Sequence, residues 1–144
     1  MNYIEVPINI INIEGDGFHL IAEGMINNKP ARFVVDTGAS RTVFDKDRIL
    51  NFIDNPEFNE KEGISAGIGG TDLSSFIFNI EELSFSDLKI NDYQAVAMDL
   101  SNVNNSYAML NIPPVDGVLG GDLLYKHKAV ISYKLKKMRL TPKQ

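Results

Sequence analysis

Apolar and polar residues alternate with a period of two along most of the chain, which is typical of half-buried β-strands. The stretches IEVPINIINIE and FHLIAEGMI are short, rich in β-branched residues and bounded by polar residues or glycine. Residues 18–36 predict a β-hairpin that turns at Asn27-Asn28. Its second strand, residues 31–35, is almost entirely apolar, so we expect a central strand that ends at Asp36.

The same alternation continues in the second half of the chain. Residues 63–78 predict two strands that are joined at Gly69-Gly70, where glycine makes the turn pliable. Residues 80–100 predict two further strands with a turn near Asn91-Asp92. A closing hairpin is expected near the end of the chain.

Two segments depart from the alternation and predict short helices. The first covers residues 45–54 with Asp45 as a possible N-cap, and the second covers residues 122–128 with Asp122 as its capping residue. The polar segment SNVNNS, residues 101–106, predicts a loop. The expected fold class is therefore all-β with one or two short helices.

Length and composition restrict the possible functions. The 144 residues contain no repeat or linker, so a single domain over residues 1–144 is expected. A net charge of −5 argues against nucleic acid as the main partner. The absence of cysteine excludes disulfides, thiolate nucleophiles and cysteine-based zinc sites.

The sequence also gives an expectation about the compartment. It shows neither a signal peptide nor an apolar run of the ~20 residues that a membrane helix needs. We therefore expect a cytoplasmic protein with no membrane segment in this chain. A trimmed domain of an exported or anchored protein is the alternative.

The segment RFVVDTGASRTVF, residues 32–44, places a carboxylate where a core strand ends. A buried carboxylate is costly unless it is hydrogen-bonded, paired or protonated. Thr37 supplies a hydroxyl, Gly38 permits close approach of the backbone, and Ala39 and Ser40 keep the turn uncrowded. These residues suit a tight loop that presents Asp36 among backbone donors.

Two other segments add to this signal. The segment VDGVLGGDLL contains the apolar pair Val118-Leu119 followed by Gly120, and by itself predicts a buried strand that ends before a helix. Between this segment and Asp36 lies a glycine-rich hairpin, which by itself is an ordinary flexible turn. The hairpin tip contains Gly67, Ile68, Gly69 and Gly70.

In this order, the three segments resemble the retropepsin-like aspartic proteases, the single-lobe branch of the acid protease clan. In that family, an apolar-apolar-Asp-Thr-Gly-Ala/Ser loop carries the catalytic aspartate, as VVDTGAS would here. A glycine-rich flap follows, matching SAGIGGTD, and an apolar-apolar-Gly strand supports the loop, matching GVLGGDLL. The resemblance covers roughly residues 17–140 and implies an acid-protease half-barrel.

The resemblance also implies a mechanism and partners. Peptide hydrolysis of this type uses two aspartates that share one proton. Since the chain has a single Asp-Thr-Gly, the dyad would consist of Asp36 from each of two identical subunits in a C2 homodimer. Thr37 would hydrogen-bond across the axis, and the flap would close over an extended peptide. No metal or cofactor is implied, because water is the nucleophile.

The sequence departs from the family pattern at three positions. Retroviral members carry a charged pair where this chain has Ser40 and Gly121, so the ionic bracing of the dimer would be missing. Position 39 is alanine, where the pepsin-like lobes use a hydroxyl residue to hydrogen-bond the carboxylate. We therefore expect activity at mildly rather than strongly acidic pH.

Other functions remain as alternatives. Asp116 or Asp122 could pair with Asp36 in a two-carboxylate glycosidase site, but Asp116 with Gly117 is more simply a turn and Asp122 a helix cap. His19 and His127 fit no zinc pattern, and we expect each at the surface or at a helix end. No serine triad or nucleotide-binding motif is indicated. A non-catalytic dimerisation or peptide-binding module on the same fold is the principal alternative.

Overall fold

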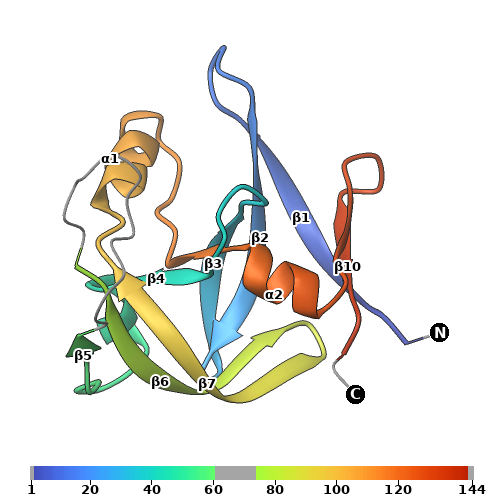
Figure 1. Ribbon diagram of the computed structural model, residues 1–144. Coiled ribbons are helices and arrows are strands. Elements are labelled where there is room, and N and C mark those ends of the chain that lie inside the picture. The colour runs from blue at the N-terminus through green and yellow to red at the C-terminus, as the bar shows by residue number, and fades with distance from the viewer. Residues whose placement is uncertain (1, 61–73, 143–144) are drawn as a thin grey trace.

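The computed structural model describes residues 2–60 and 74–142 (Figure 1). Within these ranges the strands are β1 (Ile4–Asn12), β2 (Phe18–Ile26), β3 (Lys29–Val35), β4 (Val43–Asp45), β5 (Asn59–Glu60), β6 (Phe76–Phe85), β7 (Leu88–Met98), β8 (Gly117–Leu119), β9 (Val130–Ser132) and β10 (Lys137–Leu140). The helices in the same ranges are the 3₁₀-helix η1 (Arg48–Asn51), α1 (Ser101–Met109) and α2 (Gly121–Lys126). The prediction of an all-β fold with short helices is confirmed.

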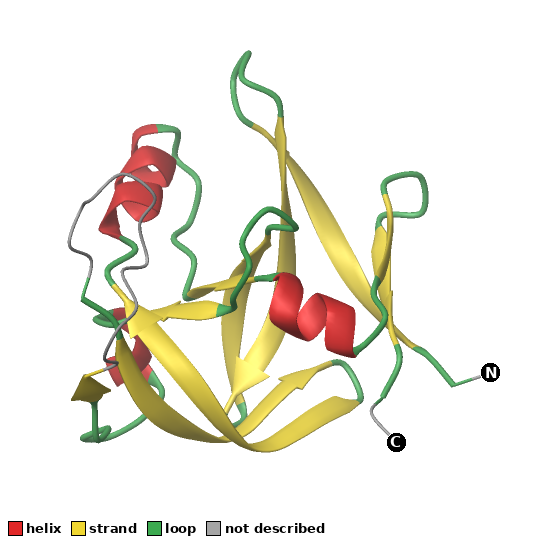
Figure 2. Ribbon diagram, in the orientation of Figure 1, coloured by secondary structure: helices red, strands yellow, loops and turns green. Residues whose placement is uncertain are grey.

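The strands form a closed barrel with an added layer. In the order β2–β3–β8–β4–β7–β6, each strand pairs with the next, and β6 pairs with β2 to close the ring. The pairs β3–β8 and β4–β7 are parallel, whereas the others are antiparallel. Strands β1, β10 and β9 extend the sheet outward from β2 (Figure 2). The late strand β8 therefore lies between the early strands β3 and β4.

The hairpin of β2 and β3 has the predicted turn. Ile26 pairs with Lys29, so Asn27 and Asn28 alone form the loop, and both have positive φ angles of 49° and 66°. Asparagine tolerates this left-handed conformation, which a two-residue type I′ turn requires. The side chain of Asn27 also accepts a hydrogen bond of 3.1 Å from the backbone N–H of Glu82. The turn is thereby fixed to β6.

Aromatic side chains fill the interior of the barrel. The ring centroid of Phe33 lies 5.8 Å from that of Phe44 and 5.1 Å from that of Phe85, and all three side chains are fully buried. Burial of one such side chain contributes about 1.5–3 kcal/mol to the free energy of unfolding. Gly24 lets β2 and β6 pair and close the barrel, because a Cβ at residue 24 would lie 2.6 Å from the backbone oxygen of Ser84. Barrel closure thus depends on a missing side chain.

Helix α1 corrects the prediction of a polar loop at residues 101–106. Asparagine and serine favour turns in isolation, but tertiary packing overrides this preference here. Tyr107 is buried in a second apolar cluster with Ile21 of β2 and Val115, and Val103 packs against it. The helix therefore covers the face of β2 that points away from the barrel interior.

Two further boundaries differ from the sequence prediction. The turn expected near Asn91-Asp92 was wrong: both residues belong to β7, and the β6–β7 loop is Ser86-Asp87, where Ser86 has a φ of 52°. The helix expected over residues 45–54 is only η1. It is shorter because Asp45 belongs to β4, where it pairs with Met98.

The C-terminal part follows the prediction. A helix expected over residues 122–128 is observed as α2, and β9 and β10 form the closing hairpin. Residues 63–73 of the two strands predicted around Gly69-Gly70 lie outside the described residues. In the parts of the chain that the structure describes, no helix is long and apolar enough to cross a membrane.

Candidate active site

Asp36 follows the last residue of β3 and is exposed to solvent. Val35 pairs with Leu119 in the parallel ladder of β3 and β8. The backbone N–H of Asp36 continues this ladder by donating a hydrogen bond of 3.0 Å to the carbonyl oxygen of Leu119. The second motif therefore fixes the point at which the chain leaves the sheet.

The loop after β3 orients the Asp36 carboxylate. The backbone N–H of Gly38 donates to Asp36 Oδ1 at 2.9 Å, and the N–H of Ala39 donates to the Asp36 carbonyl oxygen at 3.1 Å. A Cβ at Gly38 would lie 3.3 Å from the same Oδ1. The carboxylate is thus held by its own loop and still faces solvent.

Backbone hydrogen bonds join the loop to the start of α2. Gly121 N–H donates to the Ala39 carbonyl at 2.7 Å, and Asp122 N–H donates to the Ser40 carbonyl at 3.1 Å. A Cβ at Gly120 would lie 2.5 Å from the carbonyl oxygen of Arg41. Backbone groups of residues 39, 40, 121 and 122 thus join the loop to α2 within this chain, although Ser40 and Gly121 do not provide the charged pair of the retroviral pattern.

Thr42 and Asp122 reinforce this connection, and sequence reasoning missed Thr42. Asp122 Oδ1 accepts hydrogen bonds from Thr42 N–H at 2.8 Å and from Thr42 Oγ1 at 2.7 Å. The buried Thr42 hydroxyl accepts a hydrogen bond of 3.0 Å from Gly120 N–H. The only sequence signal for Thr42 is a hydroxyl residue at the entry to the apolar strand β4.

Asp122 also differs from its predicted role as helix cap. The N-cap position of α2 is Gly120, and Asp122 lies in the first turn. There its Oδ1 additionally accepts a hydrogen bond of 2.8 Å from Leu123 N–H. Asp122 therefore stabilises the Asp36 loop as well as the first turn of α2.

Tyr93 of β7 belongs to the same network. Burial raises the pKa of its hydroxyl well above the ordinary value, and the negative charge of Asp122 adds to the increase. The positive charge of Arg41 and a hydrogen bond with Thr42 act in the opposite direction. Tyr93 consequently stays neutral at all physiological pH values.

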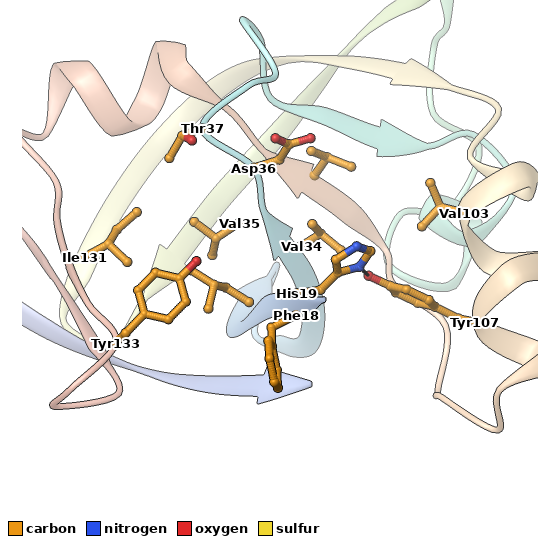
Figure 3. Close-up of a pocket in the computed structure, with 12 residues that line it drawn as sticks. Phe18, His19, Val34, Val35, Asp36, Thr37, Val103, Tyr107, Ile131 and Tyr133 are labelled. Atoms are coloured by element: carbon orange, nitrogen blue, oxygen red, sulfur yellow. Dashed lines mark hydrogen bonds between the residues drawn. The ribbon is translucent and has the colours of Figure 1, made fainter. Parts of the chain in front are cut away.

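A cavity of about 470 Å³ opens beside Asp36 (Figure 3). Val34, Val35 and Val118 give it apolar walls, while Asp36 and Thr37 lie at one end. The other residues around it are Phe18, His19, Leu20, Val103, Tyr107, Ile131 and Tyr133. Among the described residues that line this cavity, only Asp36 carries a carboxylate.

Asp116 lies elsewhere and has a structural environment. The buried Asp116 Oδ1 is 2.8 Å from Nε of the half-buried Arg48 in an ion pair, and Asp116 Oδ2 accepts a hydrogen bond of 2.8 Å from Arg32 N–H. The predicted turn at Asp116-Gly117 was wrong, because Gly117 already belongs to β8. Neither Asp116 nor Asp122 lines the cavity, so the two-carboxylate glycosidase alternative loses its geometric basis.

Of the remaining predicted residues, the second motif and Thr37 lie next to Asp36 or its loop. Val118 lines the cavity, Leu119 accepts the hydrogen bond from Asp36, and Gly120 approaches the loop closely. Thr37 is exposed beside Asp36. The predicted flap, Gly67, Ile68, Gly69 and Gly70, lies outside the described residues.

Sequence comparison gives a family. The family described as "Aspartyl protease" matches residues 22–123, which include both the Asp36 loop and β8. A comparison with curated protein sequences found no match.

Solved structures share the fold at low sequence identity. A retropepsin-like aspartic protease from Rickettsia conorii is 17% identical, with 97% of this chain and 91% of that chain covered and a TM-score of 0.57. EIAV protease in complex with the inhibitor HBY-793 is 20% identical, with coverages of 78% and 90% and a TM-score of 0.56.

The retroviral protease-like domain of Ddi1 from Leishmania major is also similar. It is 15% identical, with 86% of this chain and 92% of that chain covered, and has a TM-score of 0.52. The family match extends over more than two thirds of the chain, and the closed barrel has the retropepsin-like architecture. The chain therefore belongs to the aspartyl protease family and has a retropepsin-like fold.

Proposed function

We propose that the protein is an aspartic endopeptidase that acts as a homodimer on extended peptides. The observation that carries this proposal is Asp36, the single carboxylate among the described residues that line the cavity, on a loop anchored to β8 and α2. One carboxylate cannot supply both the base and the acid that peptide hydrolysis requires. Because Asp36 is exposed, the same residue of a second subunit can approach it along a two-fold axis.

Each step of the proposed reaction uses this pair. The two carboxyl groups share one proton, since two like charges in contact do not both ionise readily. The ionised group takes a proton from water, whose oxygen attacks the peptide carbonyl carbon while the protonated group gives its proton to the carbonyl oxygen. As the C–N bond of the resulting gem-diol breaks, the protonated carboxyl group gives its proton to the leaving nitrogen and the ionised group takes a proton from one gem-diol hydroxyl. A carboxylic acid and an amine are released, and one proton again remains on the pair.

Thr37, Gly38 and Ala39 have distinct roles in the proposal. Thr37 lies exposed beside Asp36 and would hydrogen-bond to the loop of the second subunit. Gly38 donates from its backbone to the carboxylate, whereas Ala39 offers no hydroxyl for this purpose. We accordingly expect an activity maximum at mildly acidic pH, and a maximum near about pH 2 would contradict this expectation.

The test is the substitution Asp36→Asn, assayed on a library of unstructured peptides between about pH 3 and about pH 8. It should abolish cleavage without changing the folded state or the sedimentation of the dimer. Asp87→Asn is a matched control because Asp87 is exposed in the β6–β7 loop and does not line the cavity.

Two outcomes would contradict the proposal in different ways. If the wild-type dimer cleaves no peptide but binds some, the domain is a non-catalytic peptide-binding or dimerisation module on this fold. If an active protein sediments only as a monomer, the shared Asp36 pair is wrong although the activity is right.

A further inference from the structure

We propose that His19 and Tyr107 form a substrate-selecting subsite that binds an acidic side chain, Asp or Glu, of the peptide. This proposal rests on the proposed function and names the substrate class of the same cavity. His19 would be the residue that contacts the substrate, and Tyr107 would position it. Neither residue belongs to the Asp-Thr-Gly loop or to the second motif.

Strand register places His19 next to the candidate catalytic residue. Leu20 of β2 pairs with Val35 of β3, so His19 and Asp36 occupy the following positions on the two antiparallel strands. Both residues line the 470 Å³ cavity. A substrate side chain that occupies this cavity is therefore within reach of both residues.

A hydrogen bond fixes the imidazole ring. His19 Nδ1 lies 2.7 Å from the hydroxyl oxygen of Tyr107, with the ring centroids 5.7 Å apart. Tyr107 is only 2% exposed and is packed with Ile21 and Val115, so its hydroxyl has little freedom to move. His19 itself is exposed. The bond thus orients a solvent-accessible ring from a rigid base.

The chemistry of the pair makes the cavity-facing nitrogen a donor. Burial raises the pKa of Tyr107, so its hydroxyl keeps a proton that it can donate to Nδ1. We assign the proton of the neutral imidazole to Nε2 for this reason, and in the charged imidazolium both nitrogens donate. Figure 3 shows the ring edge that is not bonded to Tyr107 facing the cavity. An acceptor on the substrate is therefore the complementary group.

Charge and shape favour a carboxylate as that acceptor. Histidine commonly changes its charge between about pH 5 and about pH 8, the range in which mildly acidic activity is expected. Tyr107 on α1 is hydrogen-bonded to His19, the apolar Ile11 lies across from His19 on β1, and Asp36, which follows β3, lines the same cavity. The charges of Arg32 and Asp36 act in opposite directions on the neighbouring Tyr107: Arg32 lowers the pKa of its hydroxyl and Asp36 raises it.

The surrounding wall is otherwise apolar. Val34 and Val103 line the cavity near the pair, and Val118 is a further apolar lining residue. A Glu side chain combines methylene groups for such a wall with a carboxylate for His19, whereas an aliphatic side chain would leave the imidazole donor without a partner. A charge-assisted hydrogen bond is roughly twice as strong as a neutral one, which distinguishes Glu from Gln.

The experiment measures peptide binding rather than cleavage, in the Asp36→Asn protein, so that it does not depend on catalysis. The probes are fluorescein-labelled eight-residue peptides in which each position in turn is Glu or Gln, followed by fluorescence anisotropy. At about pH 5.5 the preferred Glu peptide should bind about tenfold more tightly than its Gln counterpart, and the preference should shrink towards about pH 8.

Additional substitutions assign the preference to the pair. His19→Gln should reduce the Glu-to-Gln ratio to about twofold or less and remove its pH dependence. Tyr107→Phe keeps the aromatic packing but loses the hydroxyl, and should lower the ratio to an intermediate value. Tyr125→Phe, at a side chain that is 88% exposed on α2, should leave the ratio unchanged.

The possible results separate this proposal from the proposed function. Equal binding of Glu and Gln peptides at every position, or no peptide binding at all, would overturn the subsite. A preference that survives His19→Gln would also overturn it, and if that variant does not fold, Tyr107→Phe decides. Cleavage by the wild-type protein is measured separately. If the wild type cleaves no peptide although the Glu preference is intact, the proposed protease activity is wrong and the proposed subsite stands.

Discussion

The Asp36 loop and helix α1 border the same cavity, but different kinds of hydrogen bonds hold them in place. The loop is connected to β8 and α2 mainly through backbone groups, together with the hydrogen bond between the buried Thr42 hydroxyl and Asp122. The helix is connected to the barrel through single side chains, including the Tyr107–His19 bond. Because backbone hydrogen bonds do not depend on the identity of the side chain, we expect the loop geometry to tolerate most substitutions, whereas the position of α1 should be sensitive to single side-chain changes.

The largest effect on stability is expected from Gly120→Ala, which tests how tightly the loop is packed. A Cβ at this position would lie 2.5 Å from Arg41 carbonyl oxygen and 2.9 Å from that of Ala39, both of which are backbone atoms. The free energy of unfolding, measured with urea, should fall by about 3 kcal/mol.

Gly121→Ala is the matched control for Gly120→Ala. Its nearest atom would be the Ala39 carbonyl oxygen at 3.3 Å, and alanine is a better helix residue than glycine. A change of less than about 1 kcal/mol is expected. If both variants lower the free energy of unfolding equally, the close contact between residue 120 and the loop carbonyl groups is not the cause of the destabilisation.

Thr42→Val tests the side-chain part of the loop connection. The substitution removes the donor to Asp122 and leaves the buried N–H of Gly120 without its acceptor. The free energy of unfolding should fall by about 2 kcal/mol. We also expect kcat to decrease, because a displaced loop would displace the Asp36 carboxylate. Thr42→Ser restores the hydroxyl and should recover most of both quantities, and a Ser variant as impaired as Val would contradict the role of the hydroxyl.

Asn104→Ala tests the α1 side of the cavity. The Asn104 amide donates to Val115 carbonyl oxygen at 3.0 Å and accepts from Val115 N–H at 2.8 Å. Its loss should reduce stability by about 1 kcal/mol and raise KM more than it lowers kcat. Asn105→Ala, at an exposed position of the same helix, is the control. A fall in kcat as large as that of Thr42→Val would remove the distinction between the two sides.

Tyr93→Phe should have the smallest effect on stability near neutral pH, where only the hydrogen bond with Thr42 is lost, and its distinguishing effect should occur at alkaline pH. Burial, followed by the charge of Asp122, raises the pKa of Tyr93 in the folded protein, while the unfolded chain ionises near about pH 10. The stability contribution is therefore complete below about pH 10 and is lost as the pH rises further. The Phe variant should lose stability less steeply above this pH, whereas Tyr125→Phe should follow the wild type.

Local sequence was sufficient to predict the loop side of the cavity. The Asn27-Asn28 turn and the end of β3 at Asp36 depend on residues that are adjacent in the chain. Asp-Thr-Gly also defines its own hydrogen bonds, because the Gly38 donor is two residues from its acceptor. Short-range chemistry of this kind can be read directly from the amino-acid order.

The α1 side could not be predicted in the same way. Helix α1 forms because Val103 and Tyr107 pack against β2, and this contact outweighs the turn preference of serine and asparagine. The Ser86-Asp87 and Asn91-Asp92 segments are similar turn formers, and only barrel pairing selects the first. Thr42 and Asp122 are 80 residues apart, so no local pattern relates them.

The position of β8 between β3 and β4 has a consequence for the order of events during synthesis. Strands β3 and β4 leave the ribosome long before residues 117–119, yet the Asp36 loop has its hydrogen-bond partner only when Leu119 is in place. Such long-range pairing forms late in folding. A nascent chain would therefore carry the complete Asp-Thr-Gly sequence without the Leu119 hydrogen-bond partner of Asp36 until residues 117–119 have been synthesised.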